Sequence, residues 1–188
     1  MKAYFTGCLY QKDKFINQYE KIVATLKRTG YSVFEDTTST LLEEVLSKSD
    51  DDRISYYKKV LKWIDSSDLV VVEASFPSTL SIGHEITLSL EKSRPVIILY
   101  KKGKEPTFLM GLKNEKIIWA EYTDESLEKV LISSIEKAKM KMDVRFNFFV
   151  SPKILAYLDW IAQKRMIPRS VFLRNLIEKE MKKDKVKV

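Results

Sequence analysis

Residues 75–85 carry the side chains of this chain that are best suited to chemistry. They follow a short, β-branched apolar run at residues 69–72, which predicts a buried strand. Four hydroxyl groups suit hydrogen bonds to a sugar or a phosphate: Ser75, Ser78, Thr79 and Ser81. A helix is predicted from about residue 82, its N-terminus favours an anion, and Gly83 allows close approach of backbone or ligand. Glu85 in the first turn is either a catalytic carboxylate or a structural first-turn charge.

Three further residues belong to the same predicted site. Gly7 and Cys8 follow the first predicted strand, and Cys8 is interpreted as a small lining residue of a binding pocket. Asp36 follows the second predicted strand, where it either contacts a sugar or base or caps a turn. The only histidine, His84, is interpreted as a helix-packing residue. A single cysteine forms no internal disulfide and no zinc-binding cluster, so neither a metal nor a cofactor is expected.

The elements that would position these residues alternate between strand and helix over residues 1–140. Period-2 and β-branched segments predict strands at residues 2–6, 31–34, 69–72, 95–100 and 116–119. Apolar residues at helical spacing predict helices at 14–28, 52–65, 82–92 and 124–141. This alternation predicts an α/β domain with an open, doubly wound parallel sheet of the flavodoxin or Rossmann type. Ligands bind such sheets at the carboxyl ends of the strands, where residues 7–10 and 75–85 would meet.

Residues 1–122 resemble the nucleoside 2-deoxyribosyltransferase family, which includes relatives that hydrolyse deoxynucleoside 5'-monophosphates. The similar segments are the opening Tyr4-Phe-Thr-Gly7, residues 63–85, and the strand after Arg94-Pro95. The family loop typically reads Pro-Ser-Leu-Gly-Val-Gly-Tyr-Glu. Here the loop reads Pro77-Ser-Thr-Leu-Ser-Ile-Gly-His-Glu85 and is one residue longer.

The resemblance implies that Glu85 is the nucleophile. In this family, the glutamate attacks the anomeric carbon, displaces the base, and passes the sugar to another base or to water. The longer loop leaves either Ser78 or Thr79 to bind the 5'-phosphate or 5'-hydroxyl. The family's base-protonating aspartate is replaced by Val60. Asp65 or Asp68 could substitute for it, although Asp68 could also end the helix–strand turn. Two hypotheses follow: an N-glycosidase or deoxyribosyltransferase, or a catalytically weak regulator that senses a nucleotide.

Residues 143–188 form a second predicted domain. Alternation over residues 144–150 predicts a strand, and helices are expected to begin at Ser151-Pro152 and at residues 168–170. One strand and two helices cannot bury their apolar faces alone, so we expect a homodimer or a higher oligomer. The domain resembles the ribbon–helix–helix family, whose paired strands enter the major groove of double-stranded DNA.

The resemblance assigns DNA contacts to five residues. Arg145, Asn147 and Phe149 would face the bases, with Phe149 either touching a thymine methyl or packing on the first domain. Ser170 is expected to be the N-cap of the second helix, where Arg169 would assist in holding a backbone phosphate. A plain dimerisation hairpin without a DNA role is the alternative.

Charge and composition set outer limits on these hypotheses. Residues 143–188 hold 11 Lys/Arg and 5 Asp/Glu, a net charge of +6 within the total of +7. This excess suits phosphate contacts, although four of the eleven cations form a lysine-rich tail that could simply be solvated. At 45% hydrophobic and 31% charged residues, the chain has a globular composition. No apolar run reaches membrane-spanning length and no signal peptide is evident, so a cytoplasmic location away from membranes is expected.

Overall fold

The computed structural model describes residues 1–142 and 148–184 of the chain. The chain forms two compact units, Met1–Asp143 and Val144–Val188. None of the helices in the described residues is both long enough and apolar enough to cross a membrane.

The first unit is built on a parallel sheet, which confirms the predicted α/β fold. Five strands pair in the order β2-β1-β3-β4-β5. Their bounds are Lys2–Gly7 for β1, Ser32–Phe34 for β2, Leu69–Glu73 for β3, Val96–Lys101 for β4 and Ile117–Tyr122 for β5. This is the flavodoxin-type strand order. All strands are parallel, and the order in which the chain adds them to the sheet reverses between β1 and β3. The crevice at that switch point is where such sheets bind ligands.

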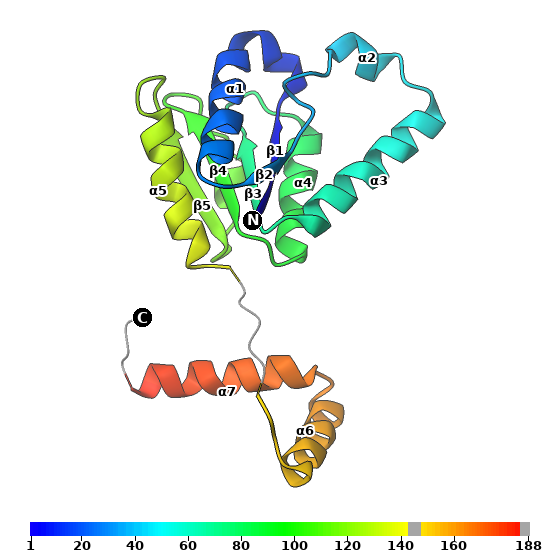
Figure 1. Ribbon diagram of the computed structural model, residues 1–188, viewed down its shortest axis with the longest axis vertical. Coiled ribbons are helices and arrows are strands. Elements are labelled where there is room, and N and C mark those ends of the chain that lie inside the picture. Colours follow the sequence, from blue (N-terminus) through cyan, green and yellow to red (C-terminus); the bar gives the residue numbers. More distant parts are fainter. Residues whose placement is uncertain (143–147, 185–188) are drawn as a thin grey trace. The chain divides into compact units, whose positions relative to one another are not determined.

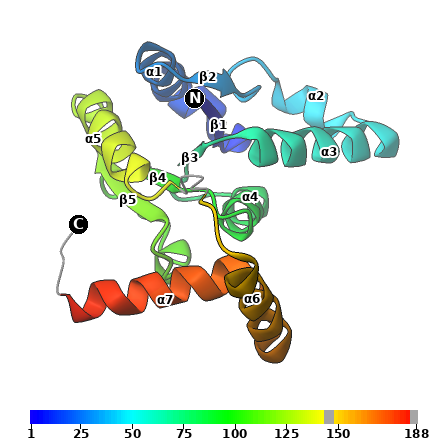
Figure 2. The same ribbon diagram turned by 60° about the horizontal axis from the view of Figure 1, so that its bottom comes forward.

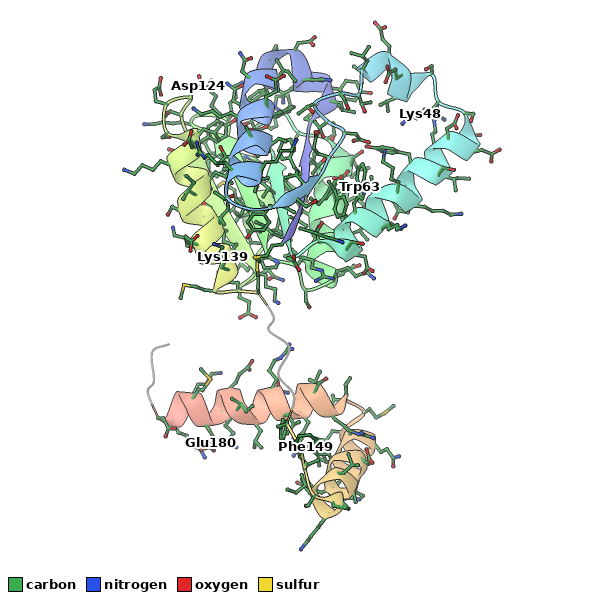
Figure 3. All side chains as sticks on the ribbon, in the orientation of Figure 1. Lys48, Trp63, Asp124, Lys139, Phe149 and Glu180 are labelled. Carbon is green, nitrogen blue, oxygen red and sulfur yellow. The ribbon has the colours of Figure 1, made fainter. Side chains whose placement is uncertain are left out.

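Helices cover both faces of the sheet (Figures 1 and 2). Helices α1 (Lys12–Arg28) and α5 (Leu127–Lys139) pack on one face against side chains such as Phe5 and Val71. Helices α3 (Asp50–Ser66) and α4 (Leu80–Glu91) pack on the other, against Tyr4, Val70 and Val72. The alternation of side chains along β1 and β3 therefore divides the core between two layers. On the α3 side, Trp63 (labelled in Figure 3) stacks on Phe34 with ring centroids 6.1 Å apart.

Three short helices were not predicted: η1 (Leu9–Gln11), α2 (Leu42–Leu46) and η2 (Leu109–Gly111). Helix α2 lies in the polar stretch between β2 and α3. It has no buried residue. Helix η1 directly follows Cys8 at the carboxyl end of β1, so it shapes the entrance to the crevice.

The second unit contains α6 (Pro152–Arg165) and α7 (Arg169–Lys183). Ser151 begins α6 as predicted, because its hydroxyl accepts a hydrogen bond from the Ile154 amide. The two helices enclose a small apolar cluster of Leu158, Ile161 and Phe172. The turn between the helices holds Met166 in the left-handed region at φ 51°, a conformation that usually favours glycine.

Two predictions for this unit need correction or remain open. Ser170 is not the N-cap of α7, because the helix begins at Arg169 with Pro168 in the N-cap position. The Pro168 carbonyl accepts hydrogen bonds from the amides of Val171 and Phe172, so the helix starts earlier than the serine suggested. Residues 148–150 lie outside any strand, and the rest of the predicted strand falls outside the described residues. The ribbon of the predicted ribbon–helix–helix domain therefore stays a prediction.

Candidate active site

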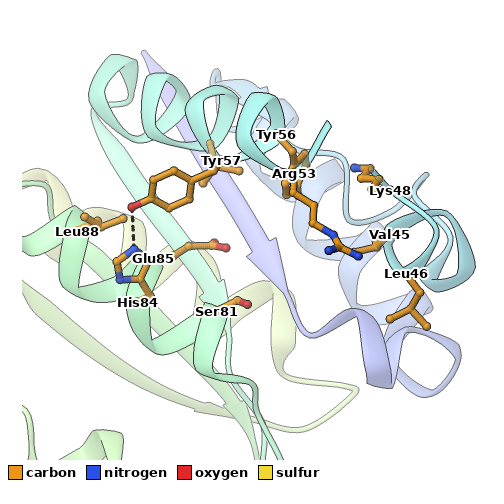
Figure 4. A pocket seen from close by; sticks show the side chains of 11 residues that line it. Val45, Leu46, Lys48, Arg53, Tyr56, Tyr57, Ser81, His84, Glu85 and Leu88 are labelled. Carbon is orange, nitrogen blue, oxygen red and sulfur yellow. Dashed lines mark hydrogen bonds between the residues drawn. The ribbon is translucent and has the colours of Figure 1, made fainter. Parts of the chain in front are cut away.

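Glu85 lies where two cavities meet at the carboxyl ends of β1 and β3. The first, here called the aromatic cavity, has a volume of about 410 Å³. Its lining includes Tyr56, Tyr57, Val60, His84, Glu85 and Leu88, with Lys48 and Arg53 also on its wall (Figure 4). The second, here called the hydroxyl cavity, has a volume of about 270 Å³. Its lining includes Thr6, Gly7, Thr37, Thr79, Ser81 and Glu85.

Two side chains of β1 hold the Glu85 carboxylate. The Tyr4 hydroxyl donates a hydrogen bond to Glu85 Oε2 over 3.0 Å, and Thr6 is a second hydrogen-bond partner. Burial raises the pKa of the Glu85 carboxyl to about 7, and the negative charge of Asp36 adds to that rise. The hydrogen bonds from Thr6 and Tyr4 oppose it, because they stabilise the ionised form.

The hydroxyl cavity has the features of an anion and sugar site. Thr79 is the N-cap of α4, and its side chain makes no capping hydrogen bond. The Thr79 hydroxyl and the first-turn amides of α4 are therefore open to a ligand at a helix N-terminus. Thr79 lines this cavity together with Glu85 and also lines the neighbouring apolar cavity beside Phe76 and Phe108, whereas Ser78 lines only the apolar cavity of these two. Of the two candidates for the phosphate-binding position, the structure places Thr79 on the side of Glu85.

The other predicted substrate-binding residues lie in different surroundings. Gly7 lines the hydroxyl cavity, and a Cβ atom there would come within 2.8 Å of the Tyr19 ring. Cys8 is buried at 3% exposure. Gly83 lines the cavity beside Phe108. Asp36 accepts hydrogen bonds from the Tyr56 hydroxyl at 3.1 Å and the Lys59 ammonium at 3.0 Å, so it holds a wall of the aromatic cavity in place.

The two carboxylates considered as replacements for the family aspartate are not brought to Glu85. The Asp68 carboxylate accepts a hydrogen bond from the Lys2 backbone amide over 2.8 Å, at the amino ends of β1 and β3. This is the end of the sheet opposite the cavities, so the structure places Asp68 in a structural contact away from Glu85. Asp65 pairs with Lys92 at 3.3 Å. Val60 is buried and lines the aromatic cavity, which gives that wall an apolar surface.

A second acidic residue that the sequence analysis missed lies at the carboxyl ends of the strands, where Glu85 also lies. Glu73, the last residue of β3, is 1% exposed and accepts hydrogen bonds from the Ser75 and Tyr122 hydroxyls. Ser75 also accepts from the Lys101 amide, so this hydroxyl serves the fold rather than a ligand. The Gln11 amide donates to the carbonyls of Ser75 and Pro77 and fixes the loop that leads to Thr79.

The structure describes three of the five predicted DNA-contacting residues. Arg145 and Asn147 lie outside the described residues. The Phe149 side chain is fully exposed. Arg169 forms a salt bridge with Asp159 that links α7 to α6, and Ser170 is exposed in the first turn of α7.

Comparison with known proteins finds two curated relatives with the same provisional name, 2'-deoxynucleoside 5'-phosphate N-hydrolase 1. The one from Syntrophotalea carbinolica is 31% identical over 124 residues, which cover 65% of this chain and 84% of the relative. The one from Nematostella vectensis is 30% identical over 139 residues, which cover 70% of this chain and 92% of the relative. A solved structure of a Clostridium botulinum CMP N-glycosidase matches 72% of this chain and 99% of its own, with 15% identity and a TM-score of 0.48. No protein-family model matches the chain.

Proposed function

The chain belongs to the nucleoside 2-deoxyribosyltransferase-like family that includes these N-hydrolases, and from this premise we propose that it is a nucleotide N-glycosidase. Its substrate would be a 2'-deoxynucleoside 5'-monophosphate, and Glu85 would be the nucleophile. The observation that carries the proposal is the position of Glu85, whose side chain lines both cavities. A carboxylate at that junction faces the bond between two chemically different parts of a ligand.

The two cavities suit the two parts of a nucleotide. The hydroxyl cavity offers Thr6, Thr37, Thr79 and the N-terminus of α4 to a sugar phosphate. The aromatic cavity offers Tyr56, Tyr57 and apolar walls to a planar base. With the sugar on one side and the base on the other, the anomeric carbon lies at Glu85.

The reaction follows from this placement in two steps. The Glu85 carboxylate attacks the anomeric carbon, the bond to the base breaks, and a glycosyl ester forms. Water then attacks the same carbon, releases the 2-deoxyribose 5-phosphate, and restores the carboxylate. If a second base occupies the aromatic cavity before water attacks, the same intermediate gives transfer of the deoxyribose instead. Tyr4 and Thr6 hold the carboxylate in the orientation that attack requires.

The test is release of free base. The protein is incubated with each common 2'-deoxynucleoside and its 5'-monophosphate, and free base is quantified by chromatography. We expect release from a monophosphate, and a loss of at least about 10³-fold in Glu85→Gln because the nucleophile is removed. Glu91→Gln, at the exposed end of the same helix, is the matched control and should keep full activity. Measurable nucleotide binding without base release would instead support a nucleotide sensor.

A second proposal concerns residues 144–188, for which we propose dimerisation and binding of double-stranded DNA in the ribbon–helix–helix manner. The observation that favours it is the apolar surface that the helices leave exposed. Ile154, Leu176 and Ile177 are 48–58% exposed, while the buried apolar cluster of the described helices holds three residues. A second copy of the unit would cover such a surface, and the net charge of +6 from residue 143 onward suits a phosphate backbone.

A further inference from the structure

We propose that His84, held by Tyr57, donates the proton that the departing base needs. This inference rests on the proposed N-glycosidase function. It assigns to His84 the protonation of the departing base, for which neither Asp65 nor Asp68 is in place. A base leaves poorly as an anion, and a positioned proton donor typically accelerates such a step by about 10²–10⁴-fold. The wall that carries Val60 supplies no carboxylate for this purpose.

The ionisable side chains that share the aromatic cavity with Glu85 narrow the choice of donor. Arginine keeps its proton under all relevant conditions. Burial raises the pKa of Tyr56 far above its usual value, and its hydroxyl already donates to Asp36. The Lys48 ammonium is held over the Tyr56 ring, 4.1 Å from the centroid, and this contact favours the charged form that keeps its proton. Histidine is the side chain that both gives and takes a proton near neutral pH, which points to His84.

The position of His84 differs from that of a packing residue. It directly precedes Glu85 on α4, lines the same cavity, and is exposed rather than buried. Its Nε2 lies 3.0 Å from the Tyr57 hydroxyl, and the two rings stack with centroids 5.9 Å apart at 15°. Figure 4 shows the Tyr57–His84 pair on one side of the Glu85 carboxylate and Arg53 on the other. Tyr57 thus links α3 to α4 and fixes the imidazole ring in the wall of the cavity that Glu85 also lines.

The proton transfers balance over the two steps of the reaction. In the imidazolium form both ring nitrogens of His84 carry a proton. The Nε2–H donates to the Tyr57 oxygen, and the Nδ1–H is given to the ring nitrogen of the base as the glycosidic bond breaks. His84 is then neutral, with a free electron pair on Nδ1. In the second step Nδ1 takes a proton from the attacking water, which restores the imidazolium while Glu85 leaves as carboxylate. Tyr57 is a positioning residue, because it acts through His84.

The test compares two leaving groups in the full-length protein. One substrate is the 2'-deoxynucleoside 5'-monophosphate that the wild type cleaves, and the other is 4-nitrophenyl 2-deoxyriboside 5-phosphate, whose leaving group departs without a proton. His84→Phe keeps a ring to stack on Tyr57 but cannot donate. We expect it to slow the release of the leaving group in a single turnover, which reports the first step alone, by about 10²–10⁴-fold for the nucleotide and by less than about 3-fold for the nitrophenyl compound. Tyr57→Phe should show the same selectivity with a smaller loss.

The outcomes distinguish a failure of the role of His84 from a failure of the proposed N-glycosidase function. Equal losses on both substrates in His84→Phe and Tyr57→Phe would show a structural role and overturn the assignment. Full activity of His84→Phe on the nucleotide would overturn it as well. The nitrophenyl activity reports that a variant is folded, and His84→Gln provides a second variant if the phenylalanine disturbs folding. Glu85→Gln should lose activity on both substrates. A wild type inactive on both would overturn the proposed function itself, and with it the role of His84.

Discussion

Glu73 and Glu85 both lie at the carboxyl end of the sheet, but their surroundings give them different roles. Burial raises the pKa of both carboxyl groups to about 7. Glu85 is partly exposed and lines two cavities, whereas Glu73 is 1% exposed and is enclosed by the hydroxyls of Ser75 and Tyr122. A raised pKa alone therefore does not identify a catalytic residue. Access to a cavity distinguishes Glu85 as the candidate nucleophile and Glu73 as part of the fold.

The pKa of Glu73 predicts how stability depends on pH. Because the folded state raises this pKa from 4.5 to about 7, the folded protein binds the proton more tightly than the unfolded chain does. The stabilisation is therefore fully present below pH 4.5 and is lost as the pH rises through 7, by up to about 3 kcal/mol. Glutamine cannot ionise, and its oxygen can accept both hydroxyl hydrogen bonds. We expect Glu73→Gln to unfold with a weaker pH dependence than the wild type and to be more stable than the wild type at pH 8.

Urea unfolding at pH 5 and pH 8 measures this effect. Glu91→Gln removes an exposed carboxyl of α4 and should leave the pH dependence of the wild type intact. An unchanged difference in free energy of unfolding between the two pH values in Glu73→Gln would contradict the prediction. The substitution is also expected to preserve the loop that leads to Thr79, since Ser75 and Gln11 keep their other hydrogen bonds.

At the scale of elements, two glycines beside the site are predicted to differ in their tolerance of a side chain. A Cβ atom on Gly7, at the end of β1, would lie 2.8 Å from the Tyr19 ring. Tyr19 is fully buried, and its hydroxyl donates to the Cys8 carbonyl over 3.0 Å, so the ring cannot easily move. A Cβ atom on Gly83, within α4, would meet Leu109 at an ordinary contact distance of 3.7 Å.

We expect Gly7→Ala to destabilise the fold by about 1–3 kcal/mol through overpacking. Gly83→Ala should be neutral or stabilising by about 0.5–1 kcal/mol, because alanine favours the helix interior. Free energies of unfolding of the two variants and the wild type measure the contrast. If both variants had the stability of the wild type, the tight approach of Gly7 to Tyr19 would be refuted.

Much of the first unit could be predicted because its elements carry strong local patterns. The β-branched run of β3 and the apolar face of α1 each determine one element type without help from distant residues. Helix α2 was missed because it is five residues long and buries none of them, so its three apolar residues, Leu42, Val45 and Leu46, are too short a run to mark a helix. The start of α7 was misplaced because the Pro168 carbonyl accepts the first hydrogen bonds of the helix, two residues before the expected cap at Ser170.

The candidate site could be predicted only in part, since its members come from distant segments. Glu85 and Thr79 were found because they lie in one loop–helix segment with a recognisable motif. Tyr4 was recognised as part of a strand and of the opening segment similar to the family, but not as a partner of Glu85, because this contact spans 81 residues of sequence. Likewise, Tyr57 carries the helical apolar pattern of α3, and only the packing of α3 beside α4 brings its hydroxyl to His84.

At the scale of the whole molecule, net positive charge and exposed apolar side chains are concentrated in the last quarter of the chain. Residues 1–142 hold 22 basic and 21 acidic side chains, a net charge of +1, whereas the remainder holds +6. If dimerisation covers the apolar surface of α7, a charge placed there should separate the protomers. We expect Ile177→Asp, at a position that is 58% exposed, to shift the full-length chain from dimer to monomer in sedimentation equilibrium. Glu178→Asp is the matched control on the same helix and should remain dimeric.

DNA binding should depend on this dimer, because two copies of residues 144–150 are needed to form the ribbon. Anisotropy of a labelled duplex, titrated between 50 and 200 mM salt, should show affinity falling linearly in log–log form with a slope of about −0.9 for each phosphate contacted. Ile177→Asp and Arg145→Ala should each weaken binding, whereas Lys187→Ala in the terminal tail should reduce it little. Weak binding that is flat with salt and indifferent to Arg145→Ala would refute the DNA role. A persistent wild-type dimer in that case would identify the unit as a dimerisation hairpin.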